Sequence, residues 1–395
     1  MRSPMICFAV FHYPSTYTDP EDYLERMPIF RDIPRVLAER GYTVHVVHLF
    51  PSSQEFTRDG VHYHFVRSGM MARRFAQGVA WITGRKATPP YEPAWHAVQI
   101  IRRLRPDLIH FHGANLYLNH ALLLAAWGGK KPPLVLHYHG GYPSPNRLVR
   151  RLQRFNYRRV ARFLFTTQTH ARPFLDAGLI DEESRVVAFM ETSSPFRPRP
   201  RAQTRHETGL RGDPVFLWAG RLDPIKDPMT ALRGFERILA SWPKAHLYVY
   251  PLTATLLPDL RTYVAARPLL KQHVHFRDRA PFEQMERLHN SSDFLFRTSL
   301  HEFSGCAVLE AMACGVIPVV TDIPSFRAMT DGGRYGVLFP PGDAEALVRG
   351  VLAIPLEEIP ERSRQVRAWF EHALSFPALA QQLDTVYREV INERV

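Results

Sequence analysis

The sequence predicts two successive α/β domains, each built on a parallel β-sheet. Three observations support this expectation. The chain has 395 residues, too many for one ordinary core but suited to two domains of about 150 to 200 residues each. Short apolar, β-branched runs alternate with helical patterns in both halves. A stretch rich in proline, arginine and polar residues separates the halves at 192–214.

In the first half, strand and helix patterns follow one another in turn. We expect strands at 5–11, 42–50, 107–113 and 133–141, and helices at 32–41, 94–106 and 120–129. The first of these helices should stop at Gly41. Because the strands are apolar on both faces and alternate with helices, they indicate a parallel, Rossmann-like sheet.

The second half repeats the alternation after the proline-rich stretch. Expected strands lie at 214–220, 245–251, 273–278, 293–298 and 316–322, and expected helices at 228–242, 282–291 and 305–315. The predicted organisation is an N-terminal domain over 1–192, a linker over 193–214, a second domain over 215–375, and a terminal helix over 376–395 that packs back on the first domain.

Composition limits the class of protein. Apolar residues make up 45% of the chain and charged residues 22%, as in ordinary globular proteins. Lys and Arg exceed Asp and Glu by 50 − 38 = 12, which favours anionic partners. The positive charge is the only feature that would suggest a nucleic-acid-binding protein. No recognition motif is evident, so we expect no nucleic acid partner.

The cysteines and the apolar runs suggest a soluble, cytoplasmic protein. Cys7, Cys306 and Cys314 match no zinc-ligand spacing, and we interpret them as reduced, buried thiols. No apolar run approaches the roughly 18 to 20 residues that span a bilayer.

Two cations follow the first strand of the second half. The segment 216–227 ends its strand at Gly220 and then supplies Arg221 and Lys226. Ligands of open α/β sheets bind beyond the carboxyl ends of the strands. An Arg that grips two oxygens and a Lys that acts as a point charge suit a diphosphate. The alternative is a solvated loop that happens to carry two cations.

A pair of glutamates flanks the start of a later helix. Ser304 and Gly305 can cap a helix that directs Val308, Leu309 and Met312 inward and stops at Gly315. Glu302 then lies at the mouth of this helix and Glu310 nearly two turns inside it. Eight residues at helical rise cover about 12 Å, a distance that suits two contacts with one elongated ligand.

These residues carry a family resemblance. Glu302-x7-Glu310, then "AMACGVIPVVTD" and "GVLFPPGDAEAL", with "GRLDPIKD" upstream, resemble the signature of retaining GT-B glycosyltransferases of the glycosyltransferase group 1 family (family 4). The resemblance covers roughly residues 215 to 350. It implies an α/β GT-B fold, in which two facing Rossmann-like domains enclose a deep cleft.

The resemblance also implies roles for individual residues. Arg221 and Lys226 would hold the diphosphate of a nucleotide sugar and neutralise the leaving group, and Glu302 would contact the hydroxyls of the donor sugar. The donor site would also include backbone N–H groups at Ser304, Gly305 and Cys306, with Glu310 on the ribose. The active-site histidine would be His139. A histidine that follows a strand is otherwise more often structural, and His112 is expected only to support the sheet end.

The implied reaction moves a hexosyl group from a nucleotide diphosphate sugar to a sugar or lipid-linked sugar acceptor, with retention of configuration. No metal and no cofactor besides the donor are expected. The product would belong to polysaccharide, lipopolysaccharide or glycolipid synthesis. The alternative is a catalytically silent nucleotide-sugar-binding subunit of a glycan-synthesis complex.

Two segments depart from the family pattern. The family often has a Gly-Gly loop after its first strand, where this chain has "HYPSTYTDPEDY". A glutamate that commonly follows the strand at 316–322 is replaced by Arg327. The acceptor side is therefore the part of the resemblance that transfers least, and His12 is a candidate residue of that side.

A set of arginines at helical spacing, the basic stripe, could bind an anionic surface. Arg147, Arg151, Arg154, Arg158 and Arg162 recur at helical spacing, opposite Leu148, Leu152, Phe155 and Phe163. The stripe could contact anionic lipid headgroups at the inner face of a membrane or a phosphorylated acceptor. The alternative is a solvated face above a buried one. The segment 70–86, with Met, Phe and Trp beside cations, is a second candidate.

Overall fold

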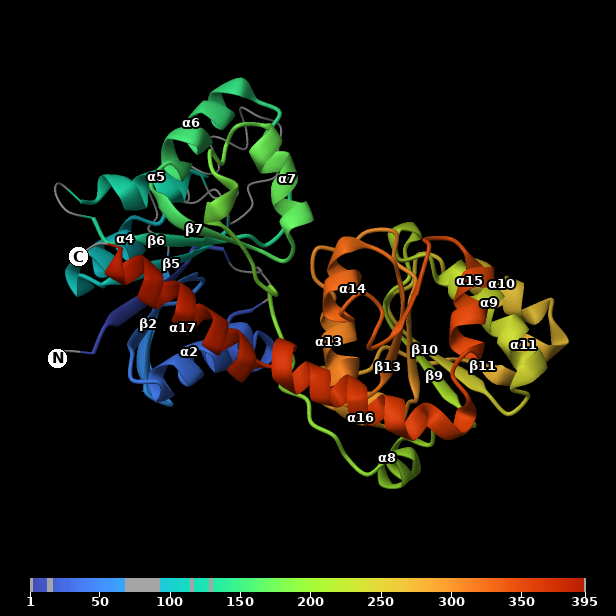
Figure 1. The fold of residues 1–395 in the computed structure, drawn as a ribbon. Helices are drawn as coiled ribbons and strands as arrows, with labels where there is room; N and C mark the ends of the chain where they lie inside the picture. Colours follow the sequence, from blue (N-terminus) through green and yellow to red (C-terminus); the bar gives the residue numbers. More distant parts are fainter. Residues whose placement is uncertain (1–2, 13–16, 68–92, 114–116, 128–130, 394–395) are drawn as a thin grey trace. The chain divides into compact units, whose positions relative to one another are not determined.

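The computed structural model describes residues 3–12, 17–67, 93–113, 117–127 and 131–393. The second basic and apolar candidate, 70–86, lies outside these residues. The chain divides into two compact units. The first contains Met1–Glu191 and Leu379–Val395, and the second contains Thr192–Ala378 (Figure 1).

The first unit is built on a sheet of eight described strands in the order β3-β4-β2-β1-β5-β6-β7-β8. All neighbouring pairs are parallel except β3 with β4, which is antiparallel. The strands are β1 Met5–Val10, β2 Thr43–Phe50, β3 Gln54–Arg58, β4 Val61–Arg67, β5 Leu108–His112, β6 Leu134–His137, β7 Val160–Phe165 and β8 Val186–Ala188. The expected parallel sheet is confirmed.

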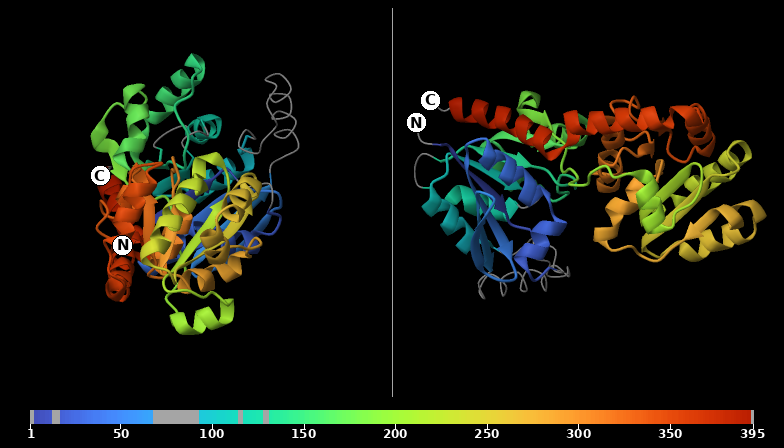
Figure 2. Two further views of the ribbon diagram at one scale, coloured as in Figure 1. Left: turned by 90° about the vertical axis from the view of Figure 1, so that its right-hand side faces the viewer. Right: turned by 90° about the horizontal axis from the view of Figure 1, so that it is seen from below.

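Helices lie against this sheet in both Figure 1 and Figure 2. They are α1 Pro20–Arg26, α2 Ile29–Glu39, α4 Trp95–Leu104, α5 Tyr117–Ala125, α6 Arg147–Tyr157, α7 Gln168–Asp176 and α17 Phe376–Asn392, with a 3₁₀ turn at Glu183–Arg185. Phe8, Phe111 and Phe163 are buried in the core. Strands β5 and β6 are buried along their whole length, and β1 from its second residue onward, so these strands are packed on both faces, as their near-continuous apolar sequences predict.

The second unit has six described strands, all parallel, in the order β11-β10-β9-β12-β13-β14. They are β9 Val215–Arg221, β10 His246–Thr253, β11 Val274–Phe276, β12 Phe294–Arg297, β13 Ile317–Thr321 and β14 Val337–Phe339. The ring of Phe216 stacks on Phe294 at 4.9 Å and on Phe296 at 4.8 Å. These contacts join β9 to β12 at the centre of the sheet.

Helices cover this sheet as well (Figures 1 and 2). They are α8 Arg201–Thr208, α9 Pro228–Ser241, α10 Leu257–Ala265, α11 Pro268–His273, α12 Phe282–Asn290, α13 Cys306–Ala313, α14 Pro324–Met329, α15 Ala344–Leu352 and α16 Ile359–Trp369. Short 3₁₀ turns occur at Pro224–Lys226 and Leu356–Glu358, and a π-helical turn at Phe370–Leu374.

The proline-rich stretch at 193–214 is more than a linker. It contains α8, and the compact unit that includes this helix begins at Thr192. Arg201 and Arg205 of α8 each donate to the carboxylate of Asp293 at 2.6 Å. The same carboxylate accepts the backbone N–H of Val215 at 2.7 Å. The arginines that gave the segment its linker-like composition therefore attach it to the start of β9 and β12.

The last helix contributes to the first unit. The hydroxyl of Tyr42 donates to Asp384 at 2.6 Å, and Arg40 donates to Gln381 at 2.6 Å. Tyr387, which is buried, hydrogen-bonds to His110 of β5. These contacts attach α17, from Leu379 onward, to the sheet of the first unit.

The contacts of Asp293 give a stability prediction. Asp293→Ala should lower the free energy of unfolding of the second unit by about 2–4 kcal/mol, because it leaves a buried N–H and two guanidinium groups without their acceptor. Urea denaturation of the full chain, followed by circular dichroism, measures the change. Glu361→Ala, at an exposed partner of Arg364, should leave it almost unchanged. Equal effects of the two substitutions would contradict this account.

Candidate functional site

Lys226 is buried by the turn that connects β9 to α9. The carboxylate of Asp223 accepts the backbone N–H of Lys226 at 3.2 Å, which closes the 3₁₀ turn Pro224–Lys226. Asp227 then adopts a φ of 42° and caps α9 through its side chain, which accepts from Thr230. The turn directs Lys226 toward the sheet, where the residue is only 5% exposed.

Glu302 is the centre of a cluster of charges. Its Oε1 accepts from Lys226 Nζ at 2.5 Å, from Arg297 Nη2 at 3.3 Å and from Ser299 Oγ at 3.1 Å. The side chains of Lys226, Arg297 and Glu302 are all close to 90% buried or more. One carboxylate cannot neutralise two cations, so the cluster carries a net positive charge that an anion would balance.

The pKa of Lys226 is affected by its burial and by the neighbouring cations. Burial lowers the pKa of the Lys226 ammonium, and repulsion from Arg297 and Arg221 lowers it further, while the hydrogen bond to Glu302 acts in the opposite direction. An anion that approached this ammonium would relieve the repulsion among the cations.

Arg297 is a member of the cluster that the sequence analysis did not identify. It lies at the end of β12, and its Nη1 donates to the carbonyl oxygen of Ala219 at 2.8 Å. A Cβ at Gly220 would lie 2.3 Å from Nη1, and Gly220 has a φ of +144°. A glycine is therefore needed where β9 passes the guanidinium. An arginine at the end of an otherwise apolar, buried strand was the available signal.

Arg221 lies beside the cluster without joining it. Its side chain is 49% exposed, and its Nε is 3.4 Å from the carboxylate of Asp223. Arg221 is thus a half-exposed cation next to a buried one.

The helix after Glu302 forms as expected. Helix α13 covers Cys306–Ala313 and buries Val308, Leu309 and Met312. Of the predicted capping pair Ser304 and Gly305, Gly305 is the N-cap, and no side-chain hydrogen bond caps this end. A Cβ at Gly305 would lie 2.7 Å from Phe326.

Helix α13 also carries Cys306 and Glu310. Cys306 is exposed at the first position of α13, so the expectation of a buried thiol holds for Cys7 and Cys314 but not here. The N-terminal backbone amides of the helix lie at this exposed end. Glu310 is mostly buried, and its Oε2 lies 3.4 Å from Nε2 of the fully buried His289.

In the first unit, His139 belongs to a line of polar side chains. Its Nδ1 lies 2.9 Å from Oε1 of Glu191, and its Nε2 lies 2.8 Å from Nδ1 of His112. His12, just beyond β1, is exposed. Partial burial lowers the pKa of the His12 imidazole, and repulsion from His139 lowers it further. The structure therefore joins His112 and His139 directly, while His12 follows β1, the strand that pairs with β5.

Glu191 was also missed, and His112 does more than support the sheet end. Glu191 follows β8 and is 52 residues from His139 in the sequence, so no spacing rule connects them. The signal that could have identified His112 is the repeated His-x-His of "HFH" and "HYH", because both lie at strand ends.

The basic stripe differs from its helical prediction. Helix α6 ends at Tyr157, so Arg158 is its C-cap and Arg162 lies in β7. Arg154 donates to the carbonyl oxygens of Gly178 at 2.7 Å and Ala177 at 3.2 Å, beyond the end of α7. This arginine therefore has a structural role.

The apolar side of α6 also differs. Leu148 is 77% exposed and Phe155 is 55% exposed, although both were expected to face inward. The buried positions are Gln153, Asn156 and Tyr157. Apolar and cationic side chains therefore share the exposed face. Among the described residues, no helix is long and apolar enough to cross a membrane.

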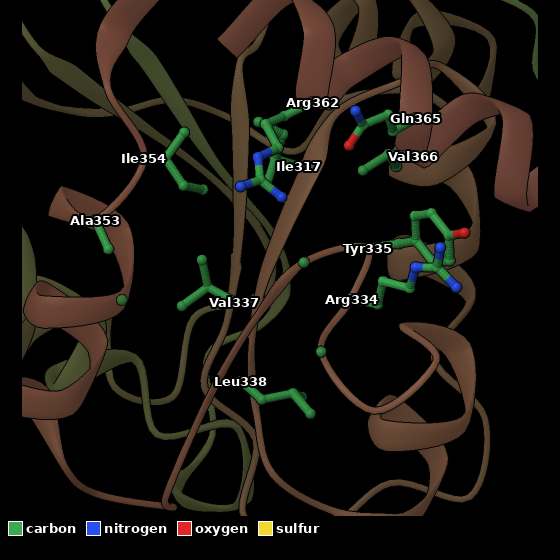
Figure 3. A pocket seen from close by; sticks show the side chains of 13 residues that line it. Ile317, Arg334, Tyr335, Val337, Leu338, Ala353, Ile354, Arg362, Gln365 and Val366 are labelled. Atoms are coloured by element: carbon green, nitrogen blue, oxygen red, sulfur yellow. The ribbon is translucent and has the colours of Figure 1, made fainter. Parts of the chain in front are cut away.

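A pocket in the second unit lies away from the charge cluster (Figure 3). It has a volume of about 300 Å³ and contains none of the predicted site residues. Side chains of Ile317, Tyr335, Val337, Ile354 and Val366 give it an apolar lining, with Arg334 and Arg362 among its polar members.

Comparisons with known proteins identify the family of the chain. The family model described as "Glycosyl transferases group 1" matches residues 213–354, and the model "Glycosyltransferase Family 4" matches residues 30–188. The chain is 25% identical over 304 residues to a GDP-mannose:cellobiosyl-diphosphopolyprenol alpha-mannosyltransferase of Xanthomonas oryzae, over 74% of this chain and 73% of the relative.

Another relative is a D-inositol 3-phosphate glycosyltransferase of Corynebacterium efficiens, 26% identical over 203 residues and 50% of this chain. The match spans 48% of that relative, about half its length.

Solved structures share the fold. A glycosyltransferase from Rickettsia africae superposes with a TM-score of 0.70 at 14% identity, over 99% of each chain. HepE of Anabaena, in complex with UDP and glucose, gives 0.67 at 16% identity, over 98% of this chain and 100% of that one. With its two parallel α/β units and both family models matched, the chain belongs to the glycosyltransferase group 1 (family 4) proteins of the GT-B fold.

Proposed function

We propose that this protein transfers a hexosyl group from a nucleotide diphosphate sugar to a sugar acceptor with retention of configuration. The observation that carries the proposal is the arrangement of Lys226 and Arg297 around Glu302. Two buried cations and one carboxylate attract a dianionic group while keeping a hydrogen-bond acceptor for sugar hydroxyls. This combination suits a sugar diphosphate better than a free phosphate or a neutral sugar.

The proposed roles follow from position. Lys226 and the exposed Arg221 contact the diphosphate, and Glu302 turns from Lys226 toward the donor sugar. The amides at Ser304, Gly305 and Cys306 contribute donors, and Glu310 binds the ribose. When the glycosidic bond breaks, negative charge develops on the leaving diphosphate, and fixed cations stabilise it without reorganisation. In this proposal, protein cations supply the charge that a divalent ion would otherwise supply to the diphosphate.

In the present arrangement, His139 has no free ring nitrogen for a substrate hydroxyl. Both of its ring nitrogens already have partners, Glu191 and His112. A substrate hydroxyl can therefore bond to a ring nitrogen only if one of these contacts opens. We propose that the contact with His112 opens, since the Glu191 carboxylate would continue to hold the ring at Nδ1.

The relatives suggest which donor to test first. The Xanthomonas relative is named for GDP-mannose and for a diphosphopolyprenol-linked acceptor. We propose GDP-mannose as the donor and a lipid-linked sugar as the acceptor, in the synthesis of a polysaccharide, lipopolysaccharide or glycolipid at the cytoplasmic side of a membrane.

The donor proposal predicts a selective thermal shift. One class among GDP-, UDP-, ADP- and dTDP-sugars should stabilise the full chain by about 2.7 kcal/mol at a hundred times its dissociation constant. Lys226→Ala should weaken that binding about 10- to 100-fold, because it removes a charge-assisted hydrogen bond. Lys244→Ala, at an exposed lysine of the second unit, is the matched control and should bind normally.

Transfer is measured with the same donor and a short-chain polyprenyl diphosphate sugar, in buffer without added divalent ions. The anomeric configuration of the product is read by NMR. Product with inverted configuration would contradict the retaining mechanism. Donor binding without transfer to any acceptor would favour the silent-subunit alternative, and the absence of any donor binding would contradict the proposed site.

We further propose that the exposed face of α6 contacts an anionic membrane surface that carries the acceptor. Arg147, Arg151 and Arg158 supply positive charge, and Leu148 and Phe155 project beside them. Exposed apolar side chains between cations are the pattern of interfacial helices, whose charges bind headgroups while the apolar groups enter the acyl boundary.

This second proposal predicts lipid-dependent binding. The protein should co-sediment with vesicles that contain anionic lipid and much less with vesicles of phosphatidylcholine alone. Leu148→Ser with Phe155→Ser should weaken binding about tenfold, since their partial burial is worth on the order of 1–2 kcal/mol. Leu252→Ser with Leu269→Ser, two exposed leucines of the second unit, is the control. Equal binding of all three proteins would contradict the assignment to α6.

A further inference from the structure

Four histidines converge where two neighbouring strands of the first unit end. His110 and His112 alternate along β5 and therefore share one face of the sheet. His137 ends β6 directly opposite His112 in the register, and His139 follows two residues later. The ring centroids of His110 and His112 are 4.4 Å apart, and those of His112 and His137 are 5.1 Å apart.

Three of these rings are buried and carry nitrogens that no described residue satisfies. His110, His112 and His137 are 1%, 3% and 1% exposed. Within the described part of the chain, Nε2 of His110, Nε2 of His112 and both nitrogens of His137 have no hydrogen-bond partner. A buried polar atom without a partner costs about 1–3 kcal/mol. The accumulation of such atoms in one place therefore requires an explanation.

The neighbouring hydrogen bonds determine which nitrogens carry lone pairs. The carboxylate of Glu191 accepts from Nδ1 of His139, so a neutral His139 has an unprotonated Nε2. This Nε2 accepts from Nδ1 of His112. His112 is then left with an unprotonated Nε2, which is the form of the ring that binds a metal.

The other rings suit the same role. Burial lowers the pKa of the His110, His112 and His137 imidazoles well below the usual value, and mutual repulsion lowers it further. Burial therefore favours the neutral imidazole, which is the form that binds a metal. Nδ1 of His110 hydrogen-bonds to the hydroxyl of Tyr387 from α17, and in the tautomer in which Nδ1 donates, Nε2 is unprotonated.

We propose that His110, His112 and His137 bind one zinc ion. One ligand nitrogen from each of the three residues lies within 4.8 Å of the others. Zinc–nitrogen bonds of about 2.0–2.1 Å bring tetrahedral ligands to about 3.4 Å from one another, so the rings would rotate inward slightly. Three imidazoles are a ligand set that zinc accepts, with a fourth position left for a further ligand.

The zinc ion would also organise the proposed active-site histidine. A histidine that binds metal through one nitrogen donates a hydrogen bond from the other, which fixes its tautomer and ring orientation. Zinc on Nε2 of His112 would keep the proton on Nδ1, where it holds His139 Nε2 until a substrate hydroxyl replaces this hydrogen bond. The metal would thus be a positioning element in the first unit, separate from the cations proposed to bind the diphosphate.

The test is metal analysis of the full chain, purified without a histidine tag. We expect about one zinc per chain after gel filtration, retained against a mild chelator. X-ray absorption at the zinc edge should show imidazole nitrogens at about 2.0 Å, from at least three histidines. This measurement on the unaltered protein does not depend on the folding of any variant. A chain that takes up no zinc, or zinc with fewer than three imidazoles, would overturn the proposal.

Variants then locate the ion. His137→Gln should lose the bound zinc, whereas His120→Gln should keep it. His120 is the matched control, because it is also buried in the first unit with both ring nitrogens unpartnered. A second control is His45→Gln, which removes a histidine whose Nδ1 lies 3.0 Å from Nε2 of His64 outside the cluster. Zinc that remains in a folded His137→Gln protein, or that is lost in His45→Gln, would contradict the assignment.

Discussion

The ion pair between Lys226 and Glu302 is the interaction on which the candidate site depends. It joins the turn after β9 to the loop after β12 at a nitrogen–oxygen distance of 2.5 Å. Other contacts hold the two segments in register, since Thr298 Oγ1 donates to the carbonyl oxygens of Lys226 and Asp227. An ammonium held this way is desolvated before any ligand arrives, so an incoming phosphate encounters little competition from water.

The excess of positive charge around Glu302 explains how the candidate site can be stable without a ligand and still attract an anion. Arg297 and Lys226 both contact its Oε1, and Arg297 is fixed by Ala219 and by the absence of a side chain at Gly220. Removing the carboxylate would leave two buried cations in mutual repulsion. In the first unit, the proposed zinc site is the opposite case, because ring nitrogens of His110, His112 and His137 lack hydrogen-bond partners among the described residues and the proposed ligand is a cation.

Helices and strands could be predicted from the sequence more accurately than the side-chain contacts between them. Strands β9, β12 and β13 and the inward face of α13 follow from apolar patterns that act locally. By contrast, Glu191 and Arg297 join the site through contacts that depend on which strands become neighbours. The predicted inward face of α6 is wrong, because the buried residues of this helix are Gln153, Asn156 and Tyr157. Leu148 and Phe155 are exposed instead. Helical periodicity specifies two faces but not which one the rest of the fold covers.

The most direct test of the central claim is calorimetric. The nucleoside diphosphate and the corresponding nucleotide sugar, identified by the donor screen, are titrated into the unaltered chain and into Glu302→Gln. If Lys226 exchanges Glu302 for the diphosphate, Glu302→Gln should bind the nucleoside diphosphate at least as tightly as the unaltered chain, because the competing carboxylate is gone. The additional affinity for the sugar should be lost. If the substitution weakened both ligands by the same factor, Glu302 would have no separate role at the sugar, and the account would be wrong.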